Sequence, residues 1–157
     1  MRDVRRQALT IASLIGAAVL VVDLVSKRWA AAHFAGRLVE VVPGLLWFEY
    51  AENPGAAFSL FRNAGPFLGL AAAVAVGVVG HALLSAKSRT EVTAFGLILG
   101  GAVGNLADRI FRGDGFLDGK VIDWIRLSPI PTFNVADSAV TVAVTLLLAR
   151  SLFGHDR

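Results

Sequence analysis

The chain has 157 residues, of which 55% are hydrophobic and 17% charged, and its mean hydropathy is +0.65. This apolar content exceeds the roughly 45–50% of ordinary soluble proteins, so we expect one integral membrane domain spanning residues 1–157. The net charge of +3 could suit nucleic acid, but no basic cluster with interleaved aromatic residues occurs, and the lack of cysteine excludes disulfides, thiolate catalysis and cysteine-ligated metals.

Four apolar stretches are long enough to cross a bilayer, which takes about 20 residues of helix. They cover residues 8–25, 66–84, 92–110 and 135–153. The pattern predicts a mainly α fold, a bundle of four transmembrane helices. Basic residues before the first stretch resemble the start of a signal peptide, but the stretch is long and no small-residue cleavage site precedes a soluble domain, so a retained first span is expected.

Lysine and arginine are unevenly divided between the two sides of this bundle. Residues 1–7, 85–91 and 150–157 hold seven basic residues in 22 positions, whereas residues 26–65 and 107–134 hold eight in 68. The positive-inside rule therefore predicts that both termini and the 85–91 loop are cytoplasmic. The two long connections, about 26–65 and 111–134, then lie near the outer leaflet.

Near the outer end of the first span, Asp23 and Lys27 are four residues apart. They share a helix face and can form an ion pair, for which a structural role is favoured. Ser26 beside Lys27 raises the alternative of a serine–lysine protease dyad. That alternative is discounted because adjacent helical positions do not face each other.

The first outer connection contains two β-branched and aromatic runs. Residues 37–42 and 45–50 flank the turn dipeptide Pro43-Gly44 and predict a β-hairpin. Many aromatic residues on this side suit the headgroup level, so we expect the small sheet to lie on the membrane surface. They are Trp29, Phe34, Trp47, Phe48, Tyr50, Phe58, Phe61 and Trp124.

The segment Asn53-Pro54-Gly55-Ala56-Ala57-Phe58 follows the hairpin. Pro54 and Gly55 suit the central positions of a turn. The small residues of the segment would also let a substrate backbone come close.

At the outer end of the third span lies the cluster Gly104-Asn105-Leu106-Ala107-Asp108-Arg109. One interpretation makes Asp108 and Arg109 a boundary ion pair, with the arginine reaching toward the interface. In the other, the guanidinium holds peptide carbonyls or a lipid phosphate. Asn105 lies three residues deeper, where an amide needs an internal partner.

Asp137 lies three positions after Asn134. If Asn134 caps the fourth helix, Asp137 falls in the first turn, where free N–H groups and the helix dipole favour negative charge. Capping alone is one interpretation. A second is functional, because an acid within a transmembrane segment costs roughly 2.5–3.5 kcal/mol and marks a functional site by default.

Asp123, in Val121-Ile122-Asp123-Trp124-Ile125, is the candidate partner of Asp137. A surface strand with one solvated acid would also explain it. However, the turn with Pro129 and Pro131 can bring the two acids face to face. Two carboxyls in one poorly solvated site cannot both ionise, so the pair can act as base and acid on a bound water, as in an aspartic protease. The helix N-terminus favours Asp137 as the ionised member and Asp123 as the acid, although the protons belong to the pair.

Metal catalysis is poorly supported, because His33, His81 and His155 are scattered and no metal-ligand spacing occurs. A rival function is a small transporter in which intramembrane acids relay protons or cations. Its relay would consist of Asp23, Asp108, Asp123 and Asp137. The outer clustering of these acids argues against it. A scaffold protein, a third possibility, predicts that Asp→Asn changes in the pair are silent.

Five polar segments occur in one order along the spans. They are Asp23-Leu24-Val25-Ser26-Lys27, Asn53-Pro54-Gly55-Ala56-Ala57-Phe58, Gly104-Asn105-Leu106-Ala107-Asp108-Arg109, Val121-Ile122-Asp123-Trp124 and Phe133-Asn134-Val135-Ala136-Asp137. Together they resemble the lipoprotein signal peptidases, or signal peptidase II, of bacterial inner membranes. The resemblance covers essentially the whole chain, and the five segments together are specific where any one alone is weak.

The resemblance implies a cofactor-independent, metal-free aspartic endopeptidase. It would remove the signal peptide of diacylglyceryl-modified prolipoproteins, cutting just before the lipidated cysteine. It matches the catalytic dyad to Asp123 and Asp137, and it matches the first-span polar pair to Asp23 and Lys27. The family's positions around the substrate match Asn53, Gly55, Asn105, Asp108, Arg109, Asn134 and Ala136.

The resemblance also implies a fold and a set of partners. The fold is four transmembrane helices with a small extracytoplasmic β-cradle and a mobile outer helix, in agreement with the hairpin. The partners are prolipoprotein signal peptides and membrane lipids, without nucleic acid, and we expect a monomer in the bacterial inner membrane.

This chain departs from the family pattern between Arg109 and Val121. Residues 110–120 form a connection several residues longer than the resemblance leads us to expect. Their glycine and aspartate content predicts an exposed, flexible excursion. Trp124 also stands where phenylalanine is more usual.

Overall fold

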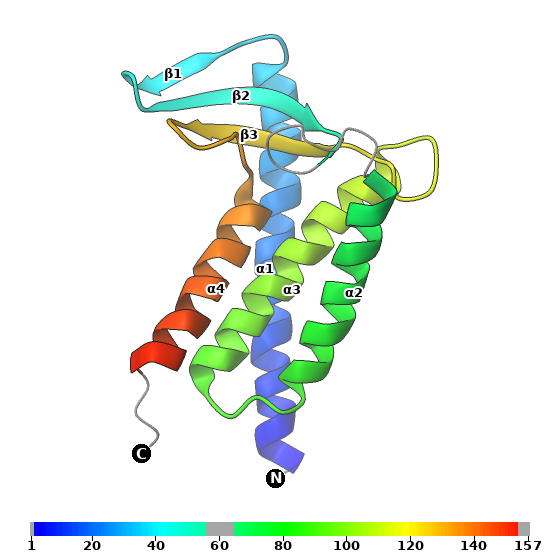
Figure 1. Ribbon diagram of the computed structural model, residues 1–157, viewed down its shortest axis with the longest axis vertical. Coiled ribbons are helices and arrows are strands. Elements are labelled where there is room, and N and C mark those ends of the chain that lie inside the picture. Colours follow the sequence, from blue (N-terminus) through cyan, green and yellow to red (C-terminus); the bar gives the residue numbers. More distant parts are fainter. Residues whose placement is uncertain (1, 56–64, 154–157) are drawn as a thin grey trace.

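The computed structural model describes residues 2–55 and 65–153 of the chain. Four long helices stand side by side, and a small sheet covers one end of them (Figure 1). The elements are α1 (Arg2–Phe34), β1 (Val39–Val42), β2 (Leu46–Asn53), α2 (Gly65–Leu83), α3 (Arg89–Phe111), β3 (Val121–Leu127) and α4 (Val135–Phe153). All four helices are long and apolar enough to cross a membrane. The predicted mainly α fold with a small sheet is therefore confirmed.

The first helix is longer than the predicted apolar stretch. It continues past residue 25 to Phe34 and reaches the sheet (Figure 1). Its polar residues do not end it because they are satisfied inside the bundle. The Ser26 hydroxyl donates to the Asp23 carbonyl (3.0 Å), and Lys27 is fully buried.

Helix α3 is the central helix of the bundle and packs against α1, α2 and α4. Glycines make this close packing possible. A Cβ atom at Gly100 would lie 2.5 Å from the carbonyl oxygen of Gly16 in α1, and one at Gly101 would lie 2.6 Å from that of Ala136 in α4. Small residues of this kind let membrane helices approach closely, because lipid supplies no hydrophobic force between them.

The predicted hairpin forms, and it is one part of a larger sheet. β1 pairs antiparallel with β2 around a turn in which Gly44 has φ +69°. A third strand, β3, pairs antiparallel with the other edge of β2, so that Ala51 lies opposite Asp123. The long-range partner of β2 was not predicted. It matters because β3 carries Asp123.

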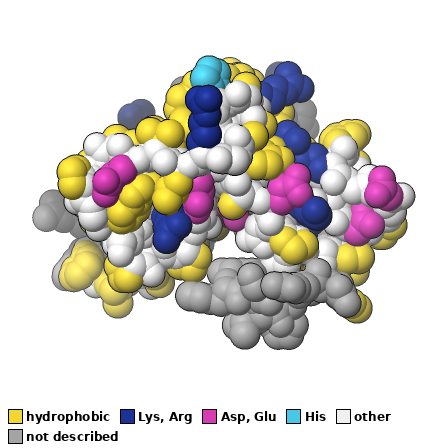
Figure 2. Space-filling model, turned by 90° about the horizontal axis from the view of Figure 1, so that it is seen from above, with side chains coloured by type: hydrophobic (Ala, Val, Ile, Leu, Met, Phe, Trp, Pro, Cys, Tyr) yellow, Lys and Arg dark blue, Asp and Glu magenta, His cyan; other side chains and the backbone are white. Residues whose placement is uncertain are grey.

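An aromatic cluster fixes the sheet on the C-terminal end of α1. Trp29 and Phe34 of α1 contact Phe48 of β2 and Trp124 of β3, with the Trp29–Trp124 ring centroids 5.5 Å apart. Edge-to-face pairs of this kind add to the burial of apolar area. Seen from the sheet end of the molecule, charged side chains of both signs lie among apolar ones (Figure 2).

The connection after α3 is exposed over most of its length, as predicted, but it is anchored at two points. Leu117 is buried, and its Cβ would lie 2.7 Å from one added at Gly69 of α2. The Gly119 N–H donates to the Arg109 carbonyl (3.1 Å). The predicted excursion is therefore exposed, and it contacts α2 and α3 at these two points. The outer helix implied by the resemblance does not occur within residues 2–55 and 65–153; Phe58 and Phe61 lie outside the described residues.

Candidate active site

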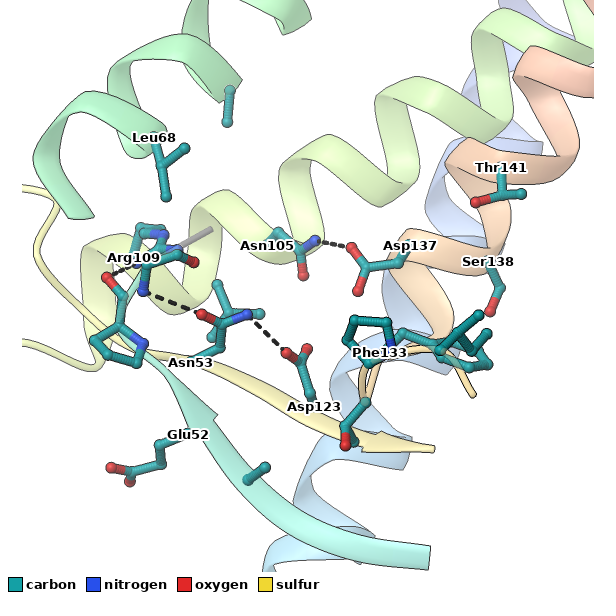
Figure 3. Close-up of a pocket in the computed structure, with 18 of the residues that line it drawn as sticks. Glu52, Asn53, Leu68, Asn105, Arg109, Asp123, Phe133, Asp137, Ser138 and Thr141 are labelled. Atoms are coloured by element: carbon teal, nitrogen blue, oxygen red, sulfur yellow. Dashed lines mark hydrogen bonds between the residues drawn. The ribbon is translucent and has the colours of Figure 1, made fainter. Parts of the chain in front are cut away.

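A cavity of about 920 Å³ opens between the sheet and the nearest ends of α2, α3 and α4. Asp123 and Asp137 both line it, and Figure 3 shows their carboxylates extending into the same space from β3 and α4. The connection between them explains this. Phe133 pairs back onto Ile125, with its N–H donating to the Ile125 carbonyl (2.9 Å), so the chain returns directly to start α4.

The fourth helix begins with a reciprocal cap. The Asp137 N–H donates to Asn134 Oδ1 (2.9 Å), and the Asn134 N–H donates to Asp137 Oδ2 (3.2 Å). The predicted cap is therefore present, and it leaves Asp137 Oδ1 available. That oxygen accepts a hydrogen bond from Asn105 Nδ2 of α3 (2.8 Å). One oxygen of Asp137 thus belongs to the helix cap, while the other accepts from Asn105, which also lines the cavity.

Asp123 is a buried acid. Its side chain accepts from Asn53 Nδ2 (3.0 Å) and from Asn134 Nδ2 (2.7 Å). Burial raises the pKa of Asp123 to about 6; the Asn53 hydrogen bond opposes this rise, and the charge of Asp137 adds to it. The interpretation of Asp123 as a solvated acid on a surface strand is wrong, because the residue is 4% exposed.

Asn53 belongs to a tight turn at the end of β2. Its Oδ1 accepts from the Gly55 N–H (3.0 Å), which directs its Nδ2 toward Asp123. The chain bends at Pro54 and Gly55, where the turn was predicted. The rest of that segment, residues 56–58, lies outside the described residues.

Lys27 lies at the centre of a buried polar network behind the cavity. Its Nζ is 2.7 Å from Asp23 Oδ2, 2.8 Å from Asp108 Oδ2 and 2.9 Å from Asn105 Oδ1. The predicted Asp23–Lys27 pair therefore forms, and Asn105 has the internal partners that its depth requires. Asp23 Oδ1 also accepts from the Ala136 N–H at the start of α4 (3.0 Å).

Asp108 and Arg109 do not pair with each other, so the boundary ion pair is wrong. Asp108 pairs with Lys27 and with Arg112 (2.6 Å), one turn further along α3. Arg109 is buried and donates to the carbonyls of Pro54 (3.1 Å), Gly55 (3.2 Å) and Gly119 (3.0 Å). Of the two interpretations, the one in which the Arg109 guanidinium holds peptide carbonyls is confirmed, and these carbonyls belong to its own chain.

Several residues that line the cavity were not predicted from the sequence as site residues. Ser138, Thr141 and Val142 of α4 line it, as do Leu68 and Ala72 of α2 and Glu52 of β2. Thr141 follows Asp137 by four residues and therefore shares its helix face, a signal that was available in the sequence. The contribution of α2 had no such signal, because it depends on how the helices pack.

The chemistry available in the cavity is that of two carboxyl groups held by amides. Within residues 2–55 and 65–153, no group of three histidine, aspartate or glutamate side chains could hold a metal ion. Two carboxyls that share one cavity can serve as base and acid toward one water molecule.

Comparisons with known proteins agree on one family. A family model described as signal peptidase (SPase) II matches residues 15–153. A lipoprotein signal peptidase of Bifidobacterium longum is 36% identical over 151 residues, covering 96% of this chain and 82% of that protein. One from Rhodococcus jostii is 38% identical over 147 residues, covering 91% and 73%.

Two solved structures share the fold. A bacterial membrane enzyme superposes with a TM-score of 0.76 at 26% identity, covering 93% of this chain and 92% of that one. A second structure, also described as a bacterial membrane enzyme, gives 0.75 at 27% identity, covering 92% and 94%.

Proposed function

Because the chain belongs to the signal peptidase II family, a family of membrane peptidases that process lipoproteins, we propose that it cleaves prolipoproteins with Asp123 and Asp137 as its catalytic pair. Its substrates are diacylglyceryl-modified precursors, and the bond cut is the one before the lipidated cysteine. The reaction needs no cofactor. The observation that supports the proposal most strongly is the pair of carboxyls that share one cavity.

The two carboxyls differ in a way that suits acid–base catalysis. Asp123 is buried, and its pKa is raised to about 6, so it retains a proton readily. Asp137 lies in the first turn of α4, where the helix dipole favours a carboxylate. Asp137 is therefore the base and Asp123 the acid, although the titration belongs to the pair.

The reaction follows from this assignment. The Asp137 carboxylate takes a proton from a water molecule as its oxygen attacks the scissile carbonyl carbon, and Asp123 donates its proton to the carbonyl oxygen. The neutral tetrahedral intermediate then breaks its C–N bond. Asp137 gives its proton to the leaving nitrogen, and Asp123 recovers a proton from the intermediate, which restores both groups.

The cavity suits a substrate that arrives within the membrane. Leu68 and Ala72 of α2 form one side and Thr141 and Val142 of α4 another, so apolar helix surface leads to the carboxyls. A signal helix can reach them laterally, with its cleavage site near the outer leaflet. Asn53, Gly55, Asn105 and Arg109 shape this site, and their contacts described above keep the cavity walls together.

The remaining parts of the proposal concern location. The basic residues of the 1–7, 85–91 and 150–157 segments favour a cytoplasmic position for both termini. The sheet and the carboxyl pair are then on the outer side of the bacterial inner membrane, and the protein works as a monomer with lipid around its helices.

The experiment is a cleavage assay with purified protein in detergent. The diacylglyceryl-modified precursor should yield two products whose masses locate the cut before the modified cysteine, and a chelator should not slow the reaction. The unmodified precursor should be cut poorly or not at all. A cut elsewhere, equal cleavage of both precursors, or inhibition by the chelator would refute the corresponding part of the proposal.

The transporter remains the rival with a specific prediction. It requires proton or cation flux in liposomes that is lost in Asp137→Asn. The four acids of the suggested relay, Asp23, Asp108, Asp123 and Asp137, gather near the sheet end of the bundle, which argues against a pathway across it. Flux without cleavage would favour the transporter.

A further inference from the structure

The amide of Asn105 lies between a cation and the candidate catalytic pair. Its Oδ1 accepts from Lys27 Nζ (2.9 Å) and from Asn134 Nδ2 (3.1 Å), while its Nδ2 donates to Asp137 Oδ1 (2.8 Å). An asparagine amide can be turned by 180° with little change of shape, so its neighbours must decide which end faces which partner. The direction of the hydrogen bond to Asp137 is therefore set by the groups on the other side.

Lys27 can set this direction because an ammonium group has three donors and no acceptor. Its Nζ donates a hydrogen bond to Asn105 Oδ1 (2.9 Å) and forms ion pairs with Asp23 Oδ2 (2.7 Å) and Asp108 Oδ2 (2.8 Å). The side chain is 0% exposed, so these three oxygens surround the ammonium group away from bulk solvent. If Asn105 turned around, its NH₂ group would face the ammonium and its oxygen would face a carboxylate, and both contacts would be repulsive.

The packing around this network leaves Lys27 little freedom to move. A Cβ atom at Gly104 would lie 2.6 Å from Asp23 Oδ2, so α3 approaches the ion pair without any side chain between them. Asp108 is held from two further sides, by Arg112 Nε (2.6 Å) and by the Ile122 N–H (3.3 Å). The network therefore connects α1, α3 and β3 behind the cavity.

We propose that Lys27 is a positioning residue for the catalytic pair: it holds the Asn105 amide with its N–H toward Asp137, which keeps Asp137 as the carboxylate and leaves the proton to Asp123. The inference rests on the proposed function of the pair. Within the described residues, the polar contacts of Lys27 go to Asp23, Asp108 and Asn105. It therefore acts on the pair through Asn105, one hydrogen bond away.

Other charged groups lie around the catalytic pair and also contribute to its pH dependence. Glu52 of β2, Arg109 of α3 and Asp123 of β3 line the same cavity as Asp137, and α2 contributes apolar Leu68 and Ala72. Behind Asn105 lie Lys27 and Asp23 of α1 and Asp108 of α3. Arg109 is committed to three carbonyls, so the side-chain donor to Asp137 is the Asn105 N–H, whose direction is set by the charged donor of Lys27 together with the neutral donor of Asn134.

The test compares Lys27→Met, which has no donor, with Lys27→Gln, which is also neutral but still carries an N–H that can donate to Asn105. We expect Lys27→Met to lower kcat about tenfold or more, the loss that follows from one hydrogen bond to a charged group, with little change in KM. The acid limb of its pH–rate profile should move upward by about one pH unit. Lys27→Gln should lie between Lys27→Met and wild type in both measurements.

A purely structural lysine would give another result. If Lys27→Met and Lys27→Gln lose activity equally and keep the wild-type acid limb, Lys27 only neutralises the buried acids and the proposal is wrong. If Lys27→Met does not fold, as judged by its elution and melting temperature in detergent, Asn105→Asp replaces it. That variant keeps an acceptor for Lys27 and removes the donor to Asp137, and an unchanged acid limb in it would overturn the proposal.

Asp123→Asn and Asp137→Asn are measured in parallel to separate the two proposals. If both are inactive while the Lys27 variants keep the wild-type profile, the positioning role alone fails. If either retains cleavage, the catalytic pair fails, and the role of Lys27 fails with it.

Discussion

Side-chain amides, rather than cations, hold each carboxyl of the candidate pair. Asn53 and Asn134 donate to Asp123, and Asn105 donates to Asp137. A neutral amide orients a carboxyl without neutralising it, so the pair can still exchange protons. Lys27 and Arg109 lie nearby, but Lys27 forms ion pairs with Asp23 and Asp108, and Arg109 donates to backbone carbonyls.

The raised pKa of Asp123 predicts a pH dependence of stability. The folded protein holds this proton up to about pH 6, whereas the ordinary value is 3.8, so the folded state loses stability as the pH rises between these values. The rise of about 2 units corresponds to about 3 kcal/mol. In Asp123→Asn this loss is absent, so its melting temperature should fall less than that of wild type between pH 4 and pH 7.

An amide at position 123 cannot accept from both Asn53 and Asn134, so we expect Asp123→Asn to have a lower melting temperature than wild type at pH 4. The comparison therefore concerns how steeply each melting temperature changes with pH. Asp114→Asn, in the exposed loop, is the matched control and should follow the wild-type slope. Equal slopes for wild type and Asp123→Asn in thermal scans would contradict the buried, proton-holding state of Asp123.

Arg109 gives a second prediction for a single residue. Its two terminal nitrogens reach the carbonyls of Pro54, Gly55 and Gly119, which one lysine nitrogen cannot span. Arg109→Lys should lower the free energy of unfolding by about 1–3 kcal/mol and reduce cleavage. Arg112→Lys can keep the i,i+4 ion pair with Asp108, so its melting temperature and cleavage rate should stay near those of wild type. Similar losses in both variants, measured by melting temperature and cleavage rate, would argue against this role of Arg109.

At the scale of elements, the interface of α1 and α3 depends on glycine. Gly100→Ala would drive a methyl group against Gly16 and Val19, at 2.5 and 2.8 Å, so the helices must separate. We expect a loss of about 1–3 kcal/mol in stability. Gly77→Ala, in α2 with nothing within 4 Å, should be neutral or slightly stabilising. If thermal scans in detergent gave equal melting temperatures for the two variants, the close packing would be disproved.

Sequence patterns predicted the elements whose signals are local. Apolar length indicated the four helices, and Pro43-Gly44 between two β-branched runs indicated the hairpin. The third strand could not be predicted in the same way, because the pairing of Ala51 with Asp123 joins positions far apart in the chain. The apolar residues on either side of Asp123 marked it as unusual, but they did not show which strand β3 pairs with.

The candidate site divides in the same way. The cap by Asn134 and the Asp23–Lys27 pair follow from helical spacing, and both were predicted. The partners of Lys27 on α3 and the carbonyls held by Arg109 depend on how helices and loops pack, which spacing does not encode. The adjacent charges of Asp108 and Arg109 even suggested a pair that the helix geometry separates.

At the scale of the whole molecule, the orientation in the membrane is directly testable. The chain has no cysteine, so single-cysteine variants can be labelled without background. Asp114→Cys and Lys87→Cys are both exposed, in the loop after α3 and in the α2–α3 connection. In intact spheroplasts, an impermeant maleimide should label Asp114→Cys and should reach Lys87→Cys only after lysis. The reverse pattern would invert the predicted topology.

The central claim is that Asp123 and Asp137 act together on one water molecule. The most direct test is cleavage of a diacylglyceryl-modified prolipoprotein by purified wild type, Asp123→Asn and Asp137→Asn, each checked for folding, with Asp114→Asn as the control. We predict that both variants of the pair lose cleavage almost entirely and that the control cleaves like wild type. Substantial cleavage by either folded variant of the pair would contradict the account.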